Sequence, residues 1–307
     1  MTHTPVRKFF KKYKVLLLMM VPGILYLLLN NYLPMFGVMI AFKNINYAKG
    51  IWGSDWIGFK NFEFLFSTSD AYIITRNTIL YNFSFIVINL IGAVGLAALM
   101  NELKNKLAAR FYQSVILLPH LFSAVIIGYL VFAFLSADYG YLNNKVLPWL
   151  GIEPLSWYNE PKVWPYILII VNTWKSVGYL SIIYLAAIIG LDKEYYEAAV
   201  IDGANKWHQF SKITLPLIAP VIIVMTLMQI GRIFSSDFGL FYQVTMNSGS
   251  ILQTTNVIDT YVYRALMNLG DIGMSSAAGL FQSVVGFILV LTVNLIVRKI
   301  SKENALF

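Results

Sequence analysis

Long apolar stretches separated by shorter polar segments dominate the chain. Six of them approach or exceed the ~20 residues that a helix needs to cross a bilayer. They cover residues 15–42, 77–99, 115–135, 165–189, 217–234 and 275–297. None shows the alternation of polar and apolar residues that is typical of membrane barrel strands. The pattern therefore predicts an all-α, polytopic membrane protein with six transmembrane helices.

Composition agrees with this pattern and narrows the chemistry. Of the 307 residues, 58% are hydrophobic and only 12% are charged, whereas soluble domains have about 25% charged residues. The chain has no cysteine, which excludes disulfides, thiolate catalysis and cysteine-ligated metals. We expect a single transmembrane domain, residues 15–307, after a basic N-terminal segment, residues 1–14.

That basic segment resembles the start of a signal peptide, because Arg7, Lys8, Lys11, Lys12 and Lys14 precede the first apolar stretch. The stretch is too long for a signal sequence, however, and it has no small-residue cleavage site. Polar residues interrupt it at 30–34, and apolar residues then resume. We therefore expect it to be retained as the first span.

The net charge of +8 follows the expected topology. With a cytoplasmic N-terminus, six spans place residues 1–14, 100–114, 190–216 and 298–307 in the cytoplasm. These four segments hold most of the 23 Lys and Arg residues, as the positive-inside rule requires. We expect both termini in the cytoplasm and no nucleic-acid partner.

The connection between the fourth and fifth spans, residues 191–216, differs from the others. Asp192-Lys193-Glu194 starts a helix with acidic residues in its first turn, Gly203 permits a break, and Pro216 opens the next span. Small and apolar side chains are mixed with charged ones. This pattern indicates a pair of short helices that docks into a groove of a partner protein.

The same segment carries a spaced motif: Glu197-Ala198-Ala199, then Gly203, then Ile213, Leu215 and Pro216. In this motif the chain resembles the permease subunits of bacterial ATP-binding-cassette (ABC) importers, whose EAA loop docks into a cleft of the ATPase subunit. The resemblance implies a type I ABC importer permease fold. It also implies a coupling role for Glu197, Ala198, Ala199, Asp202, Gly203, Ala204, Leu215 and Pro216.

Further segments extend the resemblance over residues 20 to 300. Those similar to the maltose-type and multi-sugar permeases are residues 56–62, 117–119, 169–174, 238–242 and 260–264. Residues 32–43 resemble a subgroup associated with complex glycans. The resemblance implies a permease subunit that translocates oligosaccharides delivered by an extracellular solute-binding protein. Unlike the maltose permease, this chain has no large outer insertion, so we expect a smaller contact with the binding protein.

Several motifs are absent from the sequence. Without a Gly-x-x-x-x-Gly-Lys-Ser/Thr phosphate loop, we expect ATP and Mg²⁺ to be used by separate ATPase subunits. No His-Glu-x-x-His or Gly-x-Ser-x-Gly motif supports an enzyme, and we expect no cofactor or metal on this chain. His120 is the only Asp, Glu or His in the expected spans, which disfavours a proton- or sodium-driven carrier. A secondary carrier or channel remains an alternative, as does an ABC permease for a non-sugar solute.

Polar residues at membrane depth are candidates for the substrate path. Asn172, Lys175, Ser176 and Tyr179 are spaced i, i+3, i+4, i+7 and so share one helix face. Lys175 lies near the bilayer midplane, where a charge costs at least about 2.5 kcal/mol. The alternative is that Asn172 and Lys175 bond to neighbouring helices or to a partner permease.

By resemblance, the same four residues match those that line the sugar site of the maltose-type permease. His120, Phe234 and Asp237 match further positions of that site. Asp237 either accepts hydrogen bonds from sugar hydroxyls or pairs with Lys175.

The resemblance also implies the partners: a second homologous permease, two ATPase subunits, a solute-binding protein and the bilayer of a bacterial cell membrane. The sequence leaves open whether the second permease is another copy of this chain. It also leaves open which saccharide is carried, and whether that saccharide is neutral or anionic.

Overall fold

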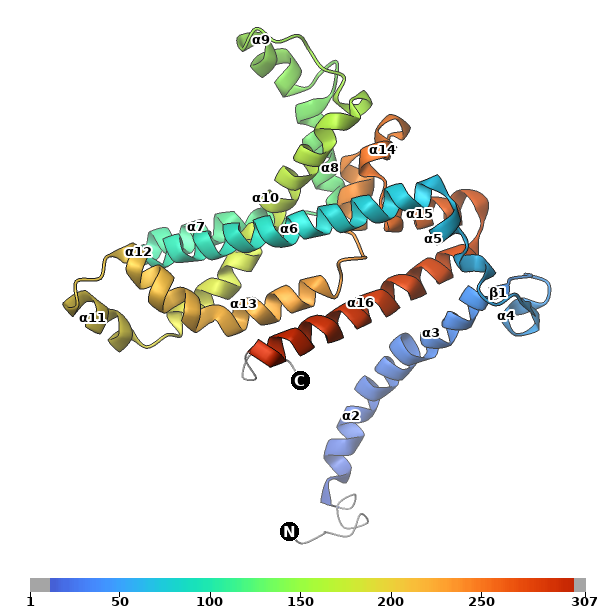
Figure 1. The fold of residues 1–307 in the computed structure, drawn as a ribbon, viewed down its shortest axis with the longest axis horizontal. Helices are drawn as coiled ribbons and strands as arrows, with labels where there is room; N and C mark the ends of the chain where they lie inside the picture. The colour runs from blue at the N-terminus through green and yellow to red at the C-terminus, as the bar shows by residue number, and fades with distance from the viewer. Residues whose placement is uncertain (1–11, 301–307) are drawn as a thin grey trace. The chain divides into compact units, whose positions relative to one another are not determined.

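The computed structural model describes residues 12–300, which are largely helical. Arg7, Lys8 and Lys11 of the basic cluster, and the tail from residue 301, lie outside the described residues. Two compact units divide the chain: residues 1–64 with 265–280, and residues 65–264 with 281–307. Figure 1 traces the elements of each. The boundary between a basic segment and a single transmembrane domain stays a prediction.

The described residues contain five helices that are long and apolar enough to cross a membrane, and a bent helix pair that makes a sixth candidate. Their order along the chain is the one expected. The candidates cover residues 12–42, 70–101, 106–135 as the bent pair, 161–189, 206–230 and 272–299.

In the first unit, the first span is a continuous helical segment whose geometry changes along its length. It consists of α2 (Lys14–Leu27), a π-helical stretch (Leu28–Tyr32), α3 (Leu33–Met35) and a 3-10 stretch (Phe36–Phe42). Strands β1 (Lys43–Asn44) and β2 (Asp55–Trp56) follow as a small antiparallel sheet around α4 (Gly50–Gly53).

A buried lysine holds this sheet together. Lys43 Nζ donates hydrogen bonds to the carbonyl oxygens of Ile51 (2.9 Å) and Trp52 (3.1 Å) and lies over the Trp56 ring. Asn61 Nδ2 donates to the Ala41 and Lys43 carbonyls. The buried amino group of Lys43 and the side-chain amide of Asn61 therefore have hydrogen-bond acceptors within this segment.

In the second unit, the helix α6 (Ser69–Asn101) packs against α10 (Trp164–Ile189), and α10 also packs against α7 (Lys106–Leu121) (Figure 1). Small residues allow these close contacts, as is usual between membrane helices. Ala93 and Ala97 of α6 are fully buried. A side chain at Gly178 of α10 would collide with the Ile116 carbonyl of α7.

The third apolar stretch, which we expected to form one span over 115–135, is bent. It forms α7 and α8 (Ala124–Leu135), which meet at an angle of 95°. The break has a local cause: Phe122 is extended, and Ser123 caps α8 by accepting a hydrogen bond from the Ile126 N–H.

Three of the prolines in continuous helical segments lie two residues after the end of a π-helical stretch. They are Pro34, Pro148 and Pro216. A proline lacks an N–H and crowds the carbonyl four residues earlier. The wider π turn relieves that conflict, so the helix continues through the proline.

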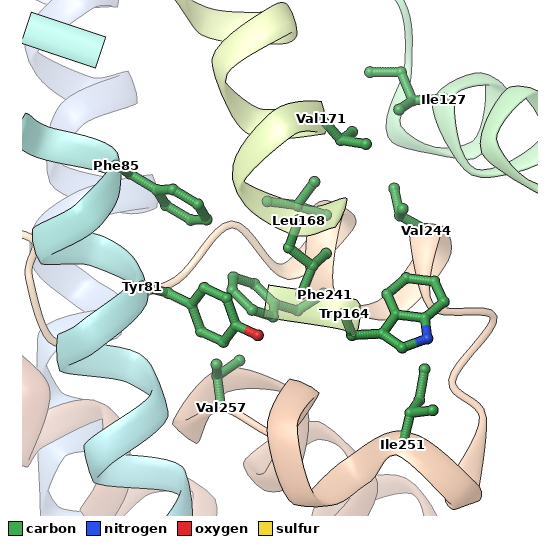
Figure 2. Close-up of a cluster of buried hydrophobic side chains, with 11 residues drawn as sticks. Tyr81, Phe85, Ile127, Trp164, Leu168, Val171, Phe241, Val244, Ile251 and Val257 are labelled. Carbon is green, nitrogen blue, oxygen red and sulfur yellow. The ribbon is translucent and has the colours of Figure 1, made fainter. Parts of the chain in front are cut away.

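A cluster of buried side chains joins α6, α8 and α10 to the segment after residue 240 (Figure 2). Trp164 is fully buried beside Val244 and Ile251, and its Nε1 donates to the Trp157 carbonyl at 2.8 Å. Tyr81 and Phe241 meet edge to face at 4.9 Å. This packing fixes the chain that follows the fifth span against the second and fourth.

The fifth candidate span consists of α12 (Lys206–Gln209), the π stretch Phe210–Thr214 and α13 (Leu215–Ile230), and the sixth is α16 (Ile272–Ile300). The remaining elements are shorter. They are 3-10 stretches at Lys60–Phe62, Trp157–Asn159, Pro161–Val163 and Gly249–Ile251; π stretches at Leu142–Val146, Leu240–Val244 and Ala265–Leu269; and the helices α5 (Phe64–Ser67), α9 (Leu147–Trp149), α11 (Lys193–Ile201), α14 (Leu252–Thr255) and α15 (Ile258–Arg264).

Candidate functional site

A cavity of about 500 Å³ lies in the second unit, among α6, α7, α10 and the end of α13. Its wall combines amide, hydroxyl, aromatic and ionisable side chains. The lining residues are Asn82, Phe85, Ile86, Asn89, His120, Asn172, Ser176, Tyr179, Leu180, Met225, Met228, Gln229, Arg232, Ser235 and Asp237. Five of the seven residues expected on the substrate path, His120, Asn172, Ser176, Tyr179 and Asp237, are therefore brought together.

Lys175 reaches the same cavity through an ion pair. Its Nζ lies 2.7 Å from Asp237 Oδ2, across 62 residues of sequence. Asp237 Oδ1 accepts a hydrogen bond from the Leu240 N–H and so starts the next helical turn. Of the two roles open to Asp237, the structure shows the pairing with Lys175. The pair lowers the cost of a charge at this depth.

Asn172 bonds across helices. Its Oδ1 accepts a 2.8 Å hydrogen bond from Asn89 Nδ2 of α6, and both side chains are more than nine-tenths buried. Within the described part of the chain, Asn89 Oδ1 has no hydrogen-bond donor. A buried acceptor without a donor is unfavourable, so a ligand hydroxyl at this point would be stabilising.

His120 and Tyr179 form a flat aromatic pair on the cavity wall. Their rings are stacked with centroids 4.4 Å apart and planes 7° from parallel. Tyr179 remains 44% exposed, which leaves part of the ring open. Such a ring can cover the C–H face of a sugar while its hydroxyl group stays available for hydrogen bonding.

The residues of α6 are the part of this wall that sequence reasoning missed. Asn82, Phe85, Ile86 and Asn89 all line the cavity, with the same i, i+3, i+4, i+7 spacing as Asn172 to Tyr179. Two asparagines on one face of an apolar span would have revealed this second wall. Gln229, Arg232 and Ser235 were also missed, because they lie at or beyond the end of α13.

The fifth span breaks where it meets the cavity. After α13 ends at Ile230, residues 231–237 leave regular helix. Non-helical backbone at membrane depth must be satisfied by other groups. Asn82 Nδ2 of α6 donates to the Ile233 and Ser235 carbonyls at 2.9 and 3.2 Å, and Gln282 Nε2 of α16 donates to the Phe234 carbonyl.

Phe234 lies in this segment but does not line the cavity, contrary to our expectation. Its ring packs edge to face against Phe281 of α16, with centroids 5.9 Å apart. The reason is the break itself: Phe234 and Asp237 no longer share one helical face once the chain leaves α13. The break directs Asp237 toward the cavity and Phe234 toward α16.

Asp259 of α15 also holds the break. Its Oδ2 accepts hydrogen bonds from the Ser236 N–H at 2.7 Å and from Gln282 Nε2 at 3.2 Å. Burial raises the pKa of the Asp259 carboxyl, and the two hydrogen bonds oppose that shift. Asp259 thus positions the backbone beside Asp237 without lining the cavity.

The expected coupling loop contains the helix pair that its motif predicts. Asp192 caps α11 by accepting from the Glu194 N–H. The helix ends at Ile201, and the turn that follows contains Gly203, whose φ of +78° favours glycine. The N–H groups of Gly203 and Ala204 close the turn on the Val200 and Ala199 carbonyls. Asn205 then caps α12 through the His208 N–H.

We had expected the second helix of the loop to be separate from the fifth span. In the structure the two are continuous. The segment Lys206–Ile230 is one candidate span built of α12, a π stretch and α13. The π stretch Phe210–Thr214 accommodates Pro216, so the proline does not begin a new helix. Movement of α12 would therefore pass directly into α13.

The loop presents both polar and apolar side chains. Glu197, Ala198, Asp202, Gly203, Leu215 and Pro216 are exposed, Ala204 is half-buried and Ala199 is buried. Val200, Ile201 and Trp207 are large exposed apolar residues, with Ile201 86% exposed. An exposed apolar patch with charges around it is typical of a protein contact surface.

Comparison with known proteins agrees with these features. Residues 93–302 match the family described as "Binding-protein-dependent transport system inner membrane component". The polygalacturonan/rhamnogalacturonan transport system permease protein YteP of Bacillus subtilis is 37% identical over 95% of this chain and 90% of its own length.

Two solved structures share the fold. A chain of a bacterial ABC transporter involved in the import of the acidic polysaccharide alginate superposes with a TM-score of 0.88 and 32% identity, covering 96% of this chain and 99% of that one. A chain of a bacterial alginate ABC transporter in complex with an alginate pentasaccharide-bound periplasmic protein gives a TM-score of 0.87 and 32% identity, covering 96% and 98%. The chain described here is therefore a multi-pass membrane permease that belongs to the family of inner-membrane components of binding-protein-dependent transport systems.

Proposed function

We propose that this chain is the permease subunit of an ABC importer for oligosaccharides, and that the cavity around Asn172, Ser176 and Tyr179 is its half of the substrate path. The observation that carries the proposal is the composition of the wall. Amide and hydroxyl groups match sugar hydroxyls, and the Tyr179 ring offers a flat apolar face. The similar polygalacturonan/rhamnogalacturonan permease and the similar alginate importer support the same substrate class.

The energy for transport comes from separate ATPase subunits in this proposal. Their surface receives α11 and the exposed side chains Val200, Ile201 and Trp207. The continuity of α12 with α13 supports a direct mechanical route, because α13 ends at the break that carries Asp237. Closing of the ATPases would thereby change the wall of the cavity.

The remaining partners and the location follow from the same proposal. A solute-binding protein delivers the saccharide from outside, and a second permease completes the path. The chain lies in a bacterial cell membrane with both termini in the cytoplasm. The distribution of Lys and Arg residues supports this orientation.

Uptake by the reconstituted importer tests the proposal. The chain is assembled in lipid vesicles with its ATPase, second permease and binding protein, and uptake of labelled oligosaccharides is measured with and without ATP. We expect ATP-dependent uptake that Asn172→Leu and Tyr179→Ala each reduce while the complex still assembles. Uptake of amino acids or peptides in place of oligosaccharides would contradict the proposal.

A further inference from the structure

The charges on the cavity wall do not cancel within this chain. Lys175 and Asp237 neutralise each other at 2.7 Å. Among the described residues that line the cavity, Asp237 is the only acidic one and Arg232 is the only lysine or arginine. With neutral histidine, one full positive charge remains, and it is carried by Arg232.

Arg232 combines a fixed backbone with a free side chain. It lies in the break after α13, where Asn82, Gln282 and Asp259 hold the neighbouring backbone groups. Within residues 12–300, its guanidinium makes no ion pair, and no side chain accepts a hydrogen bond from it. Arg232 is exposed and lies on the cavity wall, so a ligand in the cavity can reach its guanidinium.

We propose that Arg232 binds a carboxylate of the transported saccharide, so that the importer prefers uronate-containing oligosaccharides to neutral ones. The inference rests on the proposed function and names the substrate class of the same cavity. A guanidinium forms two parallel hydrogen bonds with a carboxylate. A neutral sugar would cover this guanidinium without supplying a counter-charge. Lys175 does not provide the site, because Asp237 already neutralises it.

A matched pair of substrates isolates this interaction. The complete importer is reconstituted with wild-type chain, Arg232→Gln or Arg232→Lys, and uptake is measured for a uronate trisaccharide and for the same trisaccharide with its carboxyl groups reduced to alcohols. Because the binding protein is the same throughout, the change in the ratio of the two uptake rates reports on position 232. Lys145→Gln, which removes an exposed positive charge outside the cavity, is the control.

We expect Arg232→Gln to lower uronate uptake at least about tenfold, which is the effect of losing a charge-assisted hydrogen-bond pair. Uptake of the reduced sugar should change less than about twofold. Arg232→Lys should lie between, because it keeps the charge but loses the paired geometry. Lys145→Gln should leave the ratio unchanged.

Equal losses for both sugars, or no loss for either, would overturn the proposal. If Arg232→Gln prevents assembly, the ratio in Arg232→Lys decides, and an unchanged ratio there would also overturn it. A wild-type importer that transports neither sugar, but does transport another class of solute, would instead refute the proposed function.

Discussion

The coupling loop and the substrate cavity differ in how the sequence builds them. The loop is one contiguous segment, and its turn depends on bonds between near neighbours, such as Gly203 to Val200 and Ala204 to Ala199. The cavity depends on pairs far apart in sequence: Lys175 with Asp237 across 62 residues and Asn89 with Asn172 across 83. A local site can be recognised by spacing, whereas a distributed site appears only when helices are packed together.

The difference between the coupling loop and the cavity has meaning only if the loop lies on the cytoplasmic side of the membrane. Labelling of single cysteines tests this topology, and each position should react from one side only. Single cysteines in place of Lys193 in α11 and of exposed Ser250 after the fifth span should react from opposite sides with a membrane-impermeant thiol reagent. The natural chain has no cysteine, so no background reaction with the permease arises. Labelling of both positions from one side would remove α11 from the cytoplasm and with it the coupling role.

Breaking the turn of the loop should abolish coupling. Gly203→Pro is incompatible with φ of +78° and removes the N–H that bonds to Val200. We expect oligosaccharide-stimulated ATP hydrolysis to fall to the basal rate while the complex remains assembled. Gly190→Ala is the control, because Gly190 has an ordinary helical φ and an added methyl group there makes only van der Waals contacts. Full stimulation in Gly203→Pro would refute the coupling role of the loop.

Removing the cavity's ion pair should have a smaller effect. Lys175→Met leaves Asp237 without its counter-charge, which we expect to cost about 1–3 kcal/mol, since Asp237 is partly exposed and solvent screens it. Uptake should fall about tenfold. The double variant with Asp237→Asn should recover part of that loss, and strictly additive losses would show that the two residues do not act as a pair.

The smallest expected effect concerns Asp259, which holds the backbone beside the cavity. Because burial raises the pKa of Asp259, the folded state holds this proton more tightly than the unfolded state does. Ionised Asp259 therefore destabilises the fold, and stability should fall as pH rises through the raised pKa and recover as pH is lowered. The neutral variant Asp259→Asn should lack this dependence.

Thermal unfolding of the purified protein in detergent is measured as the pH is lowered from neutrality toward about 4, the ordinary pKa of an aspartate. The difference in midpoint between wild type and Asp259→Asn should change with pH by a few degrees. Asp138→Asn, at an exposed carboxyl, provides the control and should show a constant difference. The same constant difference for Asp259→Asn would contradict the burial of its charge.

Sequence reasoning recovered the spans, the helix pair of the loop and most of one cavity wall. It succeeded where the signal is local. The length of the apolar stretches predicted the spans, and Asp192 and Gly203 marked the two ends of α11. The spacing of Asn172, Lys175, Ser176 and Tyr179 placed them on one helix face. It failed where the backbone departs from regular helix. The 95° bend follows from the extended Phe122 and the Ser123 cap, and the π stretch Phe210–Thr214 keeps α12 continuous with α13. The break that turns Phe234 away from Asp237 is held by hydrogen-bond partners on α6 and α15.

The central claim is that the transported oligosaccharide passes through the cavity. Protection of a cavity residue from chemical labelling tests this claim most directly. Ser176→Cys places a unique thiol on the wall of the cavity, and Ser250→Cys places one on an exposed surface outside it. The complete importer is assembled in nanodiscs, and the rate of reaction with a small thiol reagent is measured with and without transported oligosaccharide. The account predicts that the oligosaccharide slows labelling at position 176 and leaves labelling at position 250 unchanged. Labelling at position 176 at the same rate with and without the oligosaccharide would show that the substrate does not pass through this cavity.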